Sequence, residues 1–450
     1  MPIPAEYPLA SLRKGVFSQL ITIPEDDGWD TDPDPVRPYF QQLTEELPDI
    51  GHDQPFEKAP VYKGTGGLPP NVVDMNKVSE LNATVGTEFK TLARNMSLFV
   101  GSAGMTKPEG ATGKLFKYII PTDVDAEPLT CQLYAKQMQT TALYERIKGM
   151  LLAGFTFPFQ TAGRANYSMR FLGSGNYTKT VLGGTPTNDA YVPASYFNYQ
   201  AIINNIVAAG LTNFTVNMDN SPERIDVGGR QGLAGAIFSG YYNMSGEIGL
   251  LNTRDGSGIE ANEALHDLFE GKTEFPIQCI YADGPFATAS EFMWNCFWVR
   301  IVKPKRSIGG NSAVKQNTTW ELVPGGDWPA TVWCDNLGPF LVPASAKLGI
   351  KYKGGATIPV AITAGAARTA TQIVADLNGD GSFSTNMEAD VFMGRIRLLS
   401  KLSGVVETIQ IDTAQVDSCH ALLGFSGTVY AGDTDNPWVC RIWNALGTVV

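Results

Sequence analysis

The chain of 450 residues is 43% hydrophobic and 18% charged, with 47 glycines, 28 prolines and a net charge of −11. Its length allows about two or three domains with separate cores, and its glycine and proline content favours strands and turns. The absence of any run of about 18 apolar residues and of a signal-peptide pattern argues against a membrane span and against export, so we expect a protein made in a cytosol.

The acidity is concentrated in an N-terminal arm, which we place at 1–74. Residues 1–60 contain 12 acidic and 4 basic side chains, a balance of −8. The prolines of 24–38 exclude a helix there. Two interpretations stay open: a disordered, solvated leader, or an extended segment that docks on a neighbouring subunit through Trp29, Tyr39 and Phe40.

The middle region, 75–340, is dominated by strand patterns. Residues 154–171 predict two strands around a Thr-Ala-Gly turn. Residues 213–220 alternate, which places Phe214, Val216 and Met218 on one face. The alternation of 236–250 is longer and predicts a half-buried antiparallel strand or one continuous hairpin arm.

A short helix and a late strand pair complete the middle region. Residues 261–271 have Leu265, Leu268 and Phe269 at helical spacing and end on Gly271. Residues 297–323 predict two strands around a glycine-rich loop. Within them, 299–306 is the one local excess of positive charge, and without interleaved aromatic residues it indicates a strand face or a subunit contact rather than a nucleic-acid site.

The last region, 341–450, predicts a small α/β domain joined through 324–340. Its pattern reads strand, helix, strand, strand, helix, strand. The elements are a strand at 357–363, a helix from a capping box of Thr369 and Gln372 to Leu377, a hairpin of 391–399 and 405–411 across 401–404, and a helix that begins at Asp412 and Gln415 and stops at Gly424.

Residues 376–381, DLNGDG, match the first half of an EF-hand calcium loop. The bidentate glutamate at position 12 of that loop is replaced by Met387, and the next residues are strand formers rather than a helix. We therefore interpret the segment as the end of a helix, where Asn378, Gly379 and Gly381 would supply left-handed backbone.

No catalytic, cofactor or metal site is predicted. His52, His266 and His420 have no partner at metal-ligand spacing, and no GxSxG motif occurs. The glycines of 173–184 come after a strand, but no helix pattern comes after them to bind a phosphate. The six cysteines are scattered without a CxxC pair, so we expect buried free thiols rather than a zinc site or a disulfide scaffold.

The succession of 213–250, a short helix ending at 268–271 and the strand pair at 297–323 resembles the tail tube proteins of long-tailed, siphovirus-like bacteriophages. The resemblance covers about 75–340. It implies a tail-tube-like β-sandwich with a flanking helix in that region. Together with the small α/β domain predicted from the residues of 341–450, this gives an expected mainly β (α+β) fold; an acidic arm and a C-terminal domain of this size depart from the minimal tail tube pattern.

The resemblance also implies a function. Such subunits form rings, usually hexameric, that stack into a hollow conduit for DNA ejection in the virion tail after assembly in the host cytoplasm. The implied partners are further copies of the chain and other tail proteins such as the tape measure and tail terminator. DNA would pass without specific binding, no membrane or cofactor is involved, and the protein is not an enzyme. A net acidic protein repels phosphate, which is compatible with this role.

Other functions stay open on the sequence alone. Net acidity and long strands would equally suit another virion structural protein, such as a distal tail or decoration protein. A secreted carbohydrate- or calcium-binding adhesion module is a further alternative, suggested by the strand content, the aromatic residues and 376–381. A hydrolase with a dispersed site ranks last.

Overall fold

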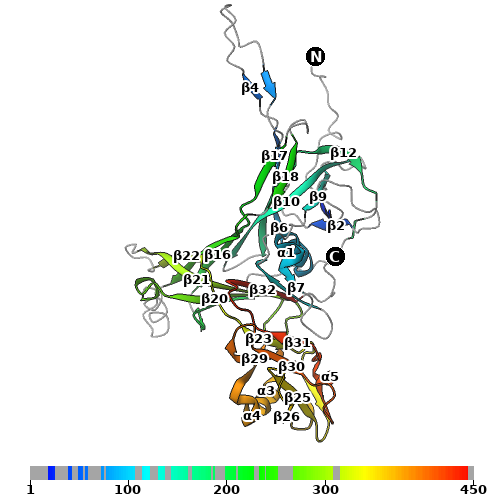
Figure 1. The fold of residues 1–450 in the computed structure, drawn as a ribbon, viewed down its shortest axis with the longest axis vertical. Helices are drawn as coiled ribbons and strands as arrows, with labels where there is room; N and C mark the ends of the chain where they lie inside the picture. Colours follow the sequence, from blue (N-terminus) through cyan, green and yellow to red (C-terminus); the bar gives the residue numbers. More distant parts are fainter. Residues whose placement is uncertain are drawn as a thin grey trace, which may run out of the picture.

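Antiparallel strands make up most of the computed structural model of the chain (Figure 1), which confirms the mainly β expectation. The helices in the described part of the chain are all too short or too polar to cross a membrane. The structure describes residues 19–25, 39–42, 49–53, 56–58, 72–74, 78–106, 114–121, 130–136, 143–160, 165–183, 186–187, 198–208, 211–227, 233–238, 240–251, 267–307 and 315–443.

One large sheet collects strands from both ends of the chain. Its members are β1 (Gln19–Pro24), β2 (Tyr39–Gln42), β3 (Asp49–Asp53), β6 (Val78–Gly86), β7 (Met105–Thr106), β8 (Leu115–Ile119), β9 (Thr130–Lys136), β10 (Leu143–Gln160), β11 (Asn166–Gly173), β12 (Tyr177–Val181), β13 (Pro186–Thr187), β14 (Tyr199–Ile203), β15 (Ile206–Val207), β16 (Leu211–Asp219), β19 (Asn243–Leu251), β20 (Glu274–Ala282), β21 (Phe292–Ser307), β22 (Lys315–Leu322) and β32 (Trp438–Trp443). We call it the main sheet.

The main sheet branches at its two longest strands. The first half of β10 pairs with β9 and β12, whereas its second half pairs with β16. The first half of β21 pairs with β32 and its second half with β22. Because each long strand changes partners along its length, the sheet can fold over one large core, beside which smaller clusters lie.

The strand pairs predicted in the middle region are confirmed. β10 and β11 pair antiparallel within 154–171, and the turn expected between them lies outside the described residues. On β16, Phe214, Val216 and Met218 are at most 1% exposed, as their alternation predicts. The basic stretch 299–306 lies on β21, which confirms a strand there.

The segment 236–250 belongs to one arm of a hairpin, as the second of its two interpretations predicts, but it is interrupted rather than continuous. β18 (Ala234–Phe238) pairs with β17 (Glu223–Asp226), whereas β19 pairs with β16 and β22. The two ladders succeed one another along one long hairpin, joined where the Gly240 amide donates to the Asn220 carbonyl at 2.7 Å. Ser221 has a φ of +45° there, which departs from extended backbone, and Gly240 approaches so closely that a Cβ on it would lie 2.4 Å from the Ser221 carbonyl oxygen.

Helix α1 (Phe89–Gly104) packs against the inner side of the main sheet and was not predicted. Phe89, Leu92, Met96 and Phe99 are fully buried on it. Lys90 and Arg94 are also at most 9% exposed, so the helix lacks the solvated polar face on which recognition of an amphipathic pattern depends. Of the helix expected at 261–271, residues 267–270 are helical, and 261–266 lie outside the described residues.

The N-terminal segment contributes a strand to the subunit's own sheet. β1 lies between β2 and β9, and its Leu20, Ile21 and Ile23 are at most 1% exposed. The buried Glu25 carboxylate accepts hydrogen bonds from the Thr130 hydroxyl at 2.8 Å and the Gly149 amide at 3.0 Å. For residues 19–25, both interpretations of the arm are therefore wrong.

The rest of the arm is less fully described. Tyr39 and Phe40 lie in β2, which pairs with β1, and Trp29 lies outside the described residues. β4 (Phe56–Lys58) pairs with β5 (Val72–Asp74) as a separate two-stranded sheet.

Beyond the main sheet lies a C-terminal unit with its own core and small sheets. Its elements are β23 (Pro329–Trp333), β24 (Phe340–Val342), β25 (Lys347–Tyr352), β26 (Ile358–Ala361), β27 (Gly365–Arg368), α3 (Ala370–Gly379), α4 (Gly381–Asn386), β28 (Met387–Phe392), β29 (Arg395–Ser403), β30 (Thr408–Ile411), α5 (His420–Leu423) and β31 (Val429–Ala431).

Two elements of the C-terminal unit differ from the prediction. The hairpin expected across 401–404 is wrong: β29 pairs with β28 and β23, whereas β30 pairs with β25 and β31. The true hairpin turn is Met393–Gly394, whose φ values of 52° and 70° suit a tight two-residue turn. The last helix ends at Gly424 as expected but begins at His420, because the Asp412 carboxylate accepts from the Ala414 amide in a turn.

Candidate assembly surfaces

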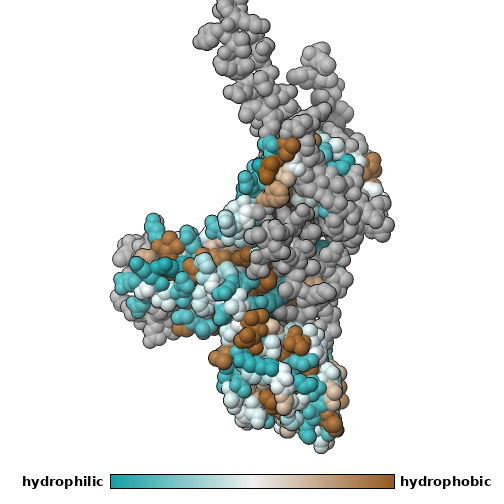
Figure 2. Space-filling view, viewed as in Figure 1, coloured by the Kyte–Doolittle hydropathy of each residue, from teal (hydrophilic) through white to brown (hydrophobic). Residues whose placement is uncertain are grey.

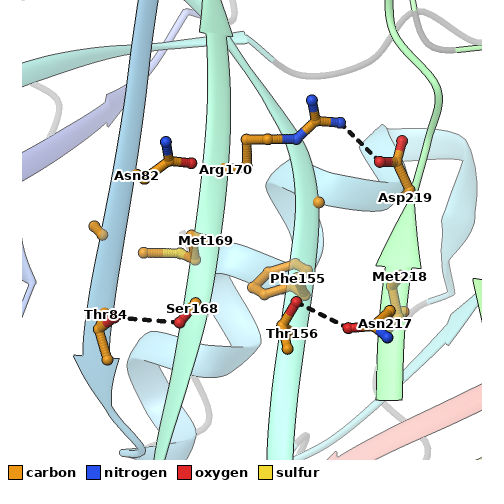
Figure 3. A pocket seen from close by; sticks show the side chains of 12 residues that line it. Asn82, Thr84, Phe155, Thr156, Ser168, Met169, Arg170, Asn217, Met218 and Asp219 are labelled. Atoms are coloured by element: carbon orange, nitrogen blue, oxygen red, sulfur yellow. Dashed lines mark hydrogen bonds and ion pairs between the residues drawn. The ribbon is translucent and has the colours of Figure 1, made fainter. Parts of the chain in front are cut away.

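The main sheet presents a polar, hollowed face on the side opposite its core (Figure 3). The hollow measures about 390 Å³ and lies over four adjacent strands. Its polar side chains, which we call the polar sheet face, are Asn82 and Thr84 on β6, Ser168 and Arg170 on β11, Thr156 on β10, and Asn217 and Asp219 on β16.

Strand alternation builds this face. On β11 the residues alternate between half-buried and buried, so that Ser168 and Arg170 point outward while Tyr167 and Met169 enter the core. On β10, Phe155 points inward and Thr156 outward in the same way. The period of two therefore separates an aromatic core from a hydroxyl- and amide-rich surface.

The polar sheet face is close to electrically neutral. Its two charged residues pair with each other, since Arg170 Nη2 lies 2.7 Å from Asp219 Oδ2. Both side chains are more than 40% exposed, so solvent weakens this ion pair. Hydrogen bonds between uncharged side chains join neighbouring strands. Thr84 on β6 lies 3.2 Å from Ser168 on β11, and Thr156 on β10 lies 3.1 Å from Asn217 on β16. Among the described side chains that line this face, the one cation, Arg170, is already paired and leaves no excess positive charge to hold phosphate.

A second surface, the junction, joins the main sheet to the C-terminal unit. It consists of aromatic rings contributed by both parts, with Phe292 and Trp294 from β21 and Trp333 and Phe392 from the unit. Phe392 lies 5.4 Å from Trp294 and 5.0 Å from Trp333, measured between ring centroids. Such ring contacts add to the stabilisation from burial alone.

Arginine side chains reinforce the junction. The Arg395 guanidinium lies 4.3 Å from the Trp443 ring centroid and donates to the Ala289 carbonyl at 2.9 Å. Burial lowers the pKa of Arg395. The adjacent Gly394 approaches so closely that a Cβ there would lie 2.2 Å from the Ala287 carbonyl oxygen. The turn between β28 and β29 therefore packs directly against the loop that precedes β21.

The chain crosses the junction twice, at adjacent points. The Trp328 amide donates to the Asp433 carbonyl at 2.8 Å, and the Asp433 amide donates back at 3.1 Å. The Asp433 carboxylate also pairs with the nearly buried Lys117 ammonium at 2.6 Å. β23, which precedes the boundary placed at 340, pairs within the unit, and β32 returns to the main sheet.

The segment 376–381 uses its side chains for local structure. The capping box of Thr369 and Gln372 is confirmed, and Asp380 caps α4 by accepting from the Ser382 and Phe383 amides. The Asp376 carboxylate accepts from the Arg368 guanidinium at 2.6 Å. The Asn378 side chain donates to the Ala389 carbonyl and accepts from the Ala389 amide, both at 2.8 Å.

The end of α3 does not use left-handed backbone, so that expectation for Asn378, Gly379 and Gly381 is wrong. Asp380 is extended instead, and a second short helix starts directly after it. Within the described residues, no three His, Cys, Asp or Glu side chains form a group that could hold a metal.

The remaining candidate residues are dispersed. His52 lies in β3, His266 lies outside the described residues, and His420 Nδ1 is 2.8 Å from the Ser418 hydroxyl. A strand, β12, lies within the glycine-rich stretch 173–184, where no helix was expected. All six cysteines are buried and free, which confirms that prediction, and burial raises the pKa of Cys296 and of Cys334 to about 12.

Neither surface was identified from the sequence. The alternation that places Thr156 and Ser168 outward was visible, but the pairing that brings four strands side by side was not. The aromatic contacts of the junction could not be predicted from local sequence patterns, because Trp294 and Phe392 are about a hundred residues apart in the sequence.

Comparison with known proteins identifies one family. A family model described as phage tail tube protein matches residues 47–322, more than half of the chain. The matched span runs from just before β3 to the last residue of β22. No curated protein matches the chain.

Proposed function

Because the chain belongs to the phage tail tube protein family, we propose that it is the major tail tube subunit, whose copies form stacked rings around a conduit for DNA ejection. Family membership makes it a structural component of the phage tail. The finer role rests on the polar sheet face, which combines strand regularity, hydroxyl and amide groups and a self-neutralised ion pair.

We assign the polar sheet face to the wall of the conduit. DNA binds proteins mainly through lysine and arginine contacts to phosphate, and each such contact releases counterions. A wall whose single arginine, Arg170, is paired with Asp219 would let the duplex move without holding it. Hydroxyl and amide side chains keep the wall hydrated, so passing DNA need not lose its own hydration.

The proposal includes the partners and place of assembly. Copies of the chain would close rings, usually hexameric in this family, and the tube would contact the tape measure and tail terminator proteins. Assembly would take place in the host cytoplasm, without cofactor or catalytic step. A distal tail or decoration role is the alternative within the virion, and it would not require a neutral conduit wall.

Charge addition tests the conduit wall. Asn82 and Asn217 are exposed on the polar sheet face, so Asn82→Lys with Asn217→Lys adds positive charge with little cost to packing. Assembled particles should then release DNA more slowly, and the delay should shrink as salt rises. Ala375→Lys with Ser403→Lys adds equal charge to exposed positions of the C-terminal unit as a control. Unchanged ejection by particles with the two lysines on the polar sheet face would contradict the assignment.

A further inference from the structure

The hairpin formed by β17 and β18, which we call the ribbon, is a separate two-stranded sheet beside the main sheet. One side of the ribbon packs on its own subunit: Ala234 and Ile237 are at most 4% exposed and contact Leu151 and Leu172. A two-stranded ribbon with one packed side normally has a polar outer side.

The outer side of the ribbon is mostly apolar instead. Ile225 pairs with Ala236 and Phe238 pairs with Glu223, and a register shift at the end of β17 brings Val227 against Gly235. Ile225, Val227 and Phe238 are 41%, 53% and 46% exposed. Figure 2 shows apolar atoms gathered over β17 and β18.

Tyr241, directly after the ribbon, extends this surface and is 92% exposed. Glu223, opposite Phe238, adds one exposed carboxylate at the edge of this surface. The two charged side chains that come next on β17 neutralise each other, because Arg224 lies 2.8 Å from Asp226 with its side chain only 11% exposed. Depletion of charge and enrichment in aromatic residues are features of the centre of a protein interface.

We propose that the outer side of the ribbon docks on a second copy of this chain. The inference rests on the proposed function, since a tube repeats one subunit and every exposed contact recurs along it. The ribbon lies at the end of the main sheet away from the C-terminal unit (Figure 1), so that unit does not obstruct a copy approaching from this end. The ribbon has only two strands and packs on its own subunit through one side, so a docked copy would cover its other side and stabilise it further.

Lysine substitution tests the contact. Ile225→Lys with Phe238→Lys should raise the concentration at which the chain assembles by about a hundredfold, because interface anchors dominate association. Its melting temperature should stay near that of the unchanged chain, since both side chains are exposed in the subunit. Val416→Lys is the control, as Val416 is a 72% exposed valine in the C-terminal unit.

The outcomes separate this inference from the proposed function. If the unchanged chain forms tubes and the double variant assembles at the same concentration, the ribbon contact is wrong and the tube role stands. If the unchanged chain never associates, both are wrong. If variant tubes form normally but fail to attach other tail proteins, the partner is not a second copy, and the inference is again wrong.

A fluorescent label gives an independent test that does not weaken the surface. Tyr241→Cys offers a thiol at an exposed position, while the six native cysteines are buried. An environment-sensitive dye on this thiol should shift to shorter wavelength on assembly, whereas the same dye on Val416→Cys should not. A dye at position 241 that stays in water within assembled tubes would overturn the proposal.

Discussion

The main sheet and the C-terminal unit each bury a hydrophobic core, but the main sheet does so with strands that are distant in the sequence and the unit with strands that are close in it. The main sheet pairs β1 with β9 and β32 with β8, so it needs segments separated by a hundred to several hundred residues. The core of the unit draws only on residues 330–430, and its two chain crossings meet at Trp328 and Asp433. The unit is therefore a local structure enclosed by a long-range one.

The main sheet is therefore not confined to the middle region, 75–340. The main sheet is finished by β32, which forms only after the chain has passed through the whole unit. The chain enters and leaves the unit at adjacent points. The entropic cost of closing the chain over the unit is therefore small.

The largest effect should come from truncation before β32. Trp438, Val439, Ile442 and Trp443 are at most 2% exposed, and their burial contributes about 6–12 kcal/mol, comparable with the stability of a whole domain. A chain ending at residue 436 should lose near-ultraviolet circular dichroism and cooperative melting of the main sheet, while the unit keeps a transition of its own. A truncated chain that still melts at the original temperature would contradict the comparison.

Deletion of the N-terminal strand should have the next largest effect. Removing residues 1–25 eliminates the buried Leu20, Ile21 and Ile23, a loss of about 5–9 kcal/mol. Deleting residues 1–18 leaves β1 intact and is the matched control. Urea unfolding should separate the two deletions sharply, and equal stability of both would show that β1 is dispensable.

A smaller effect is expected at the junction. Phe392→Ala should lower the free energy of unfolding by about 3–5 kcal/mol, because it removes ring contacts to both Trp294 and Trp333. The adjacent Val391 is 40% exposed, so Val391→Ala should change stability by less than about 0.5 kcal/mol. Thermal unfolding of the two variants measures the coupling, and identical curves would mean that the two regions do not depend on each other.

The smallest effect concerns the ends of α3 and α4. Gly379 and Gly381 lie in helices without positive φ, and a Cβ would meet nothing within 4 Å at either position. Each substitution to alanine should therefore stabilise the unit, by about 0.4–1 kcal/mol.

Gly424→Ala should destabilise the unit, because φ is +86° there and a Cβ would lie 2.7 Å from the Asn336 amide. A chelator should leave the melting temperature of all three variants unchanged, and a drop would indicate a metal at 376–381.

Local patterns predicted local structure well. The alternation on β16 and the capping box at Thr369 each depend on a few neighbouring residues, and both are confirmed. The turn at Met393–Gly394 was missed because methionine is uncommon with positive φ. α1 was missed because it is buried on every side, and the pairing of β32 with β8 depends on registers that no local pattern contains.

The candidate surfaces likewise depend on pairing between distant strands. Alternation predicts that Ser168 and Thr156 lie outward, but the polar sheet face exists only once β6, β11, β10 and β16 are paired. The ribbon was not predicted, because the alternation of 236–250 is continuous and does not show where β18 ends. Its separation from β19 depends on the backbone at Ser221 and Gly240, which hydrophobic periodicity does not report.

Cryo-electron microscopy of the purified chain at high concentration, and of the particle that contains it, tests the proposed conduit most directly. We predict a hollow tube of stacked rings, with Asn82 and Asn217 facing the channel and the ribbon buried between copies. Monomers at every concentration and absence from the tail, or a tube in which the polar sheet face points away from the channel, would contradict this prediction.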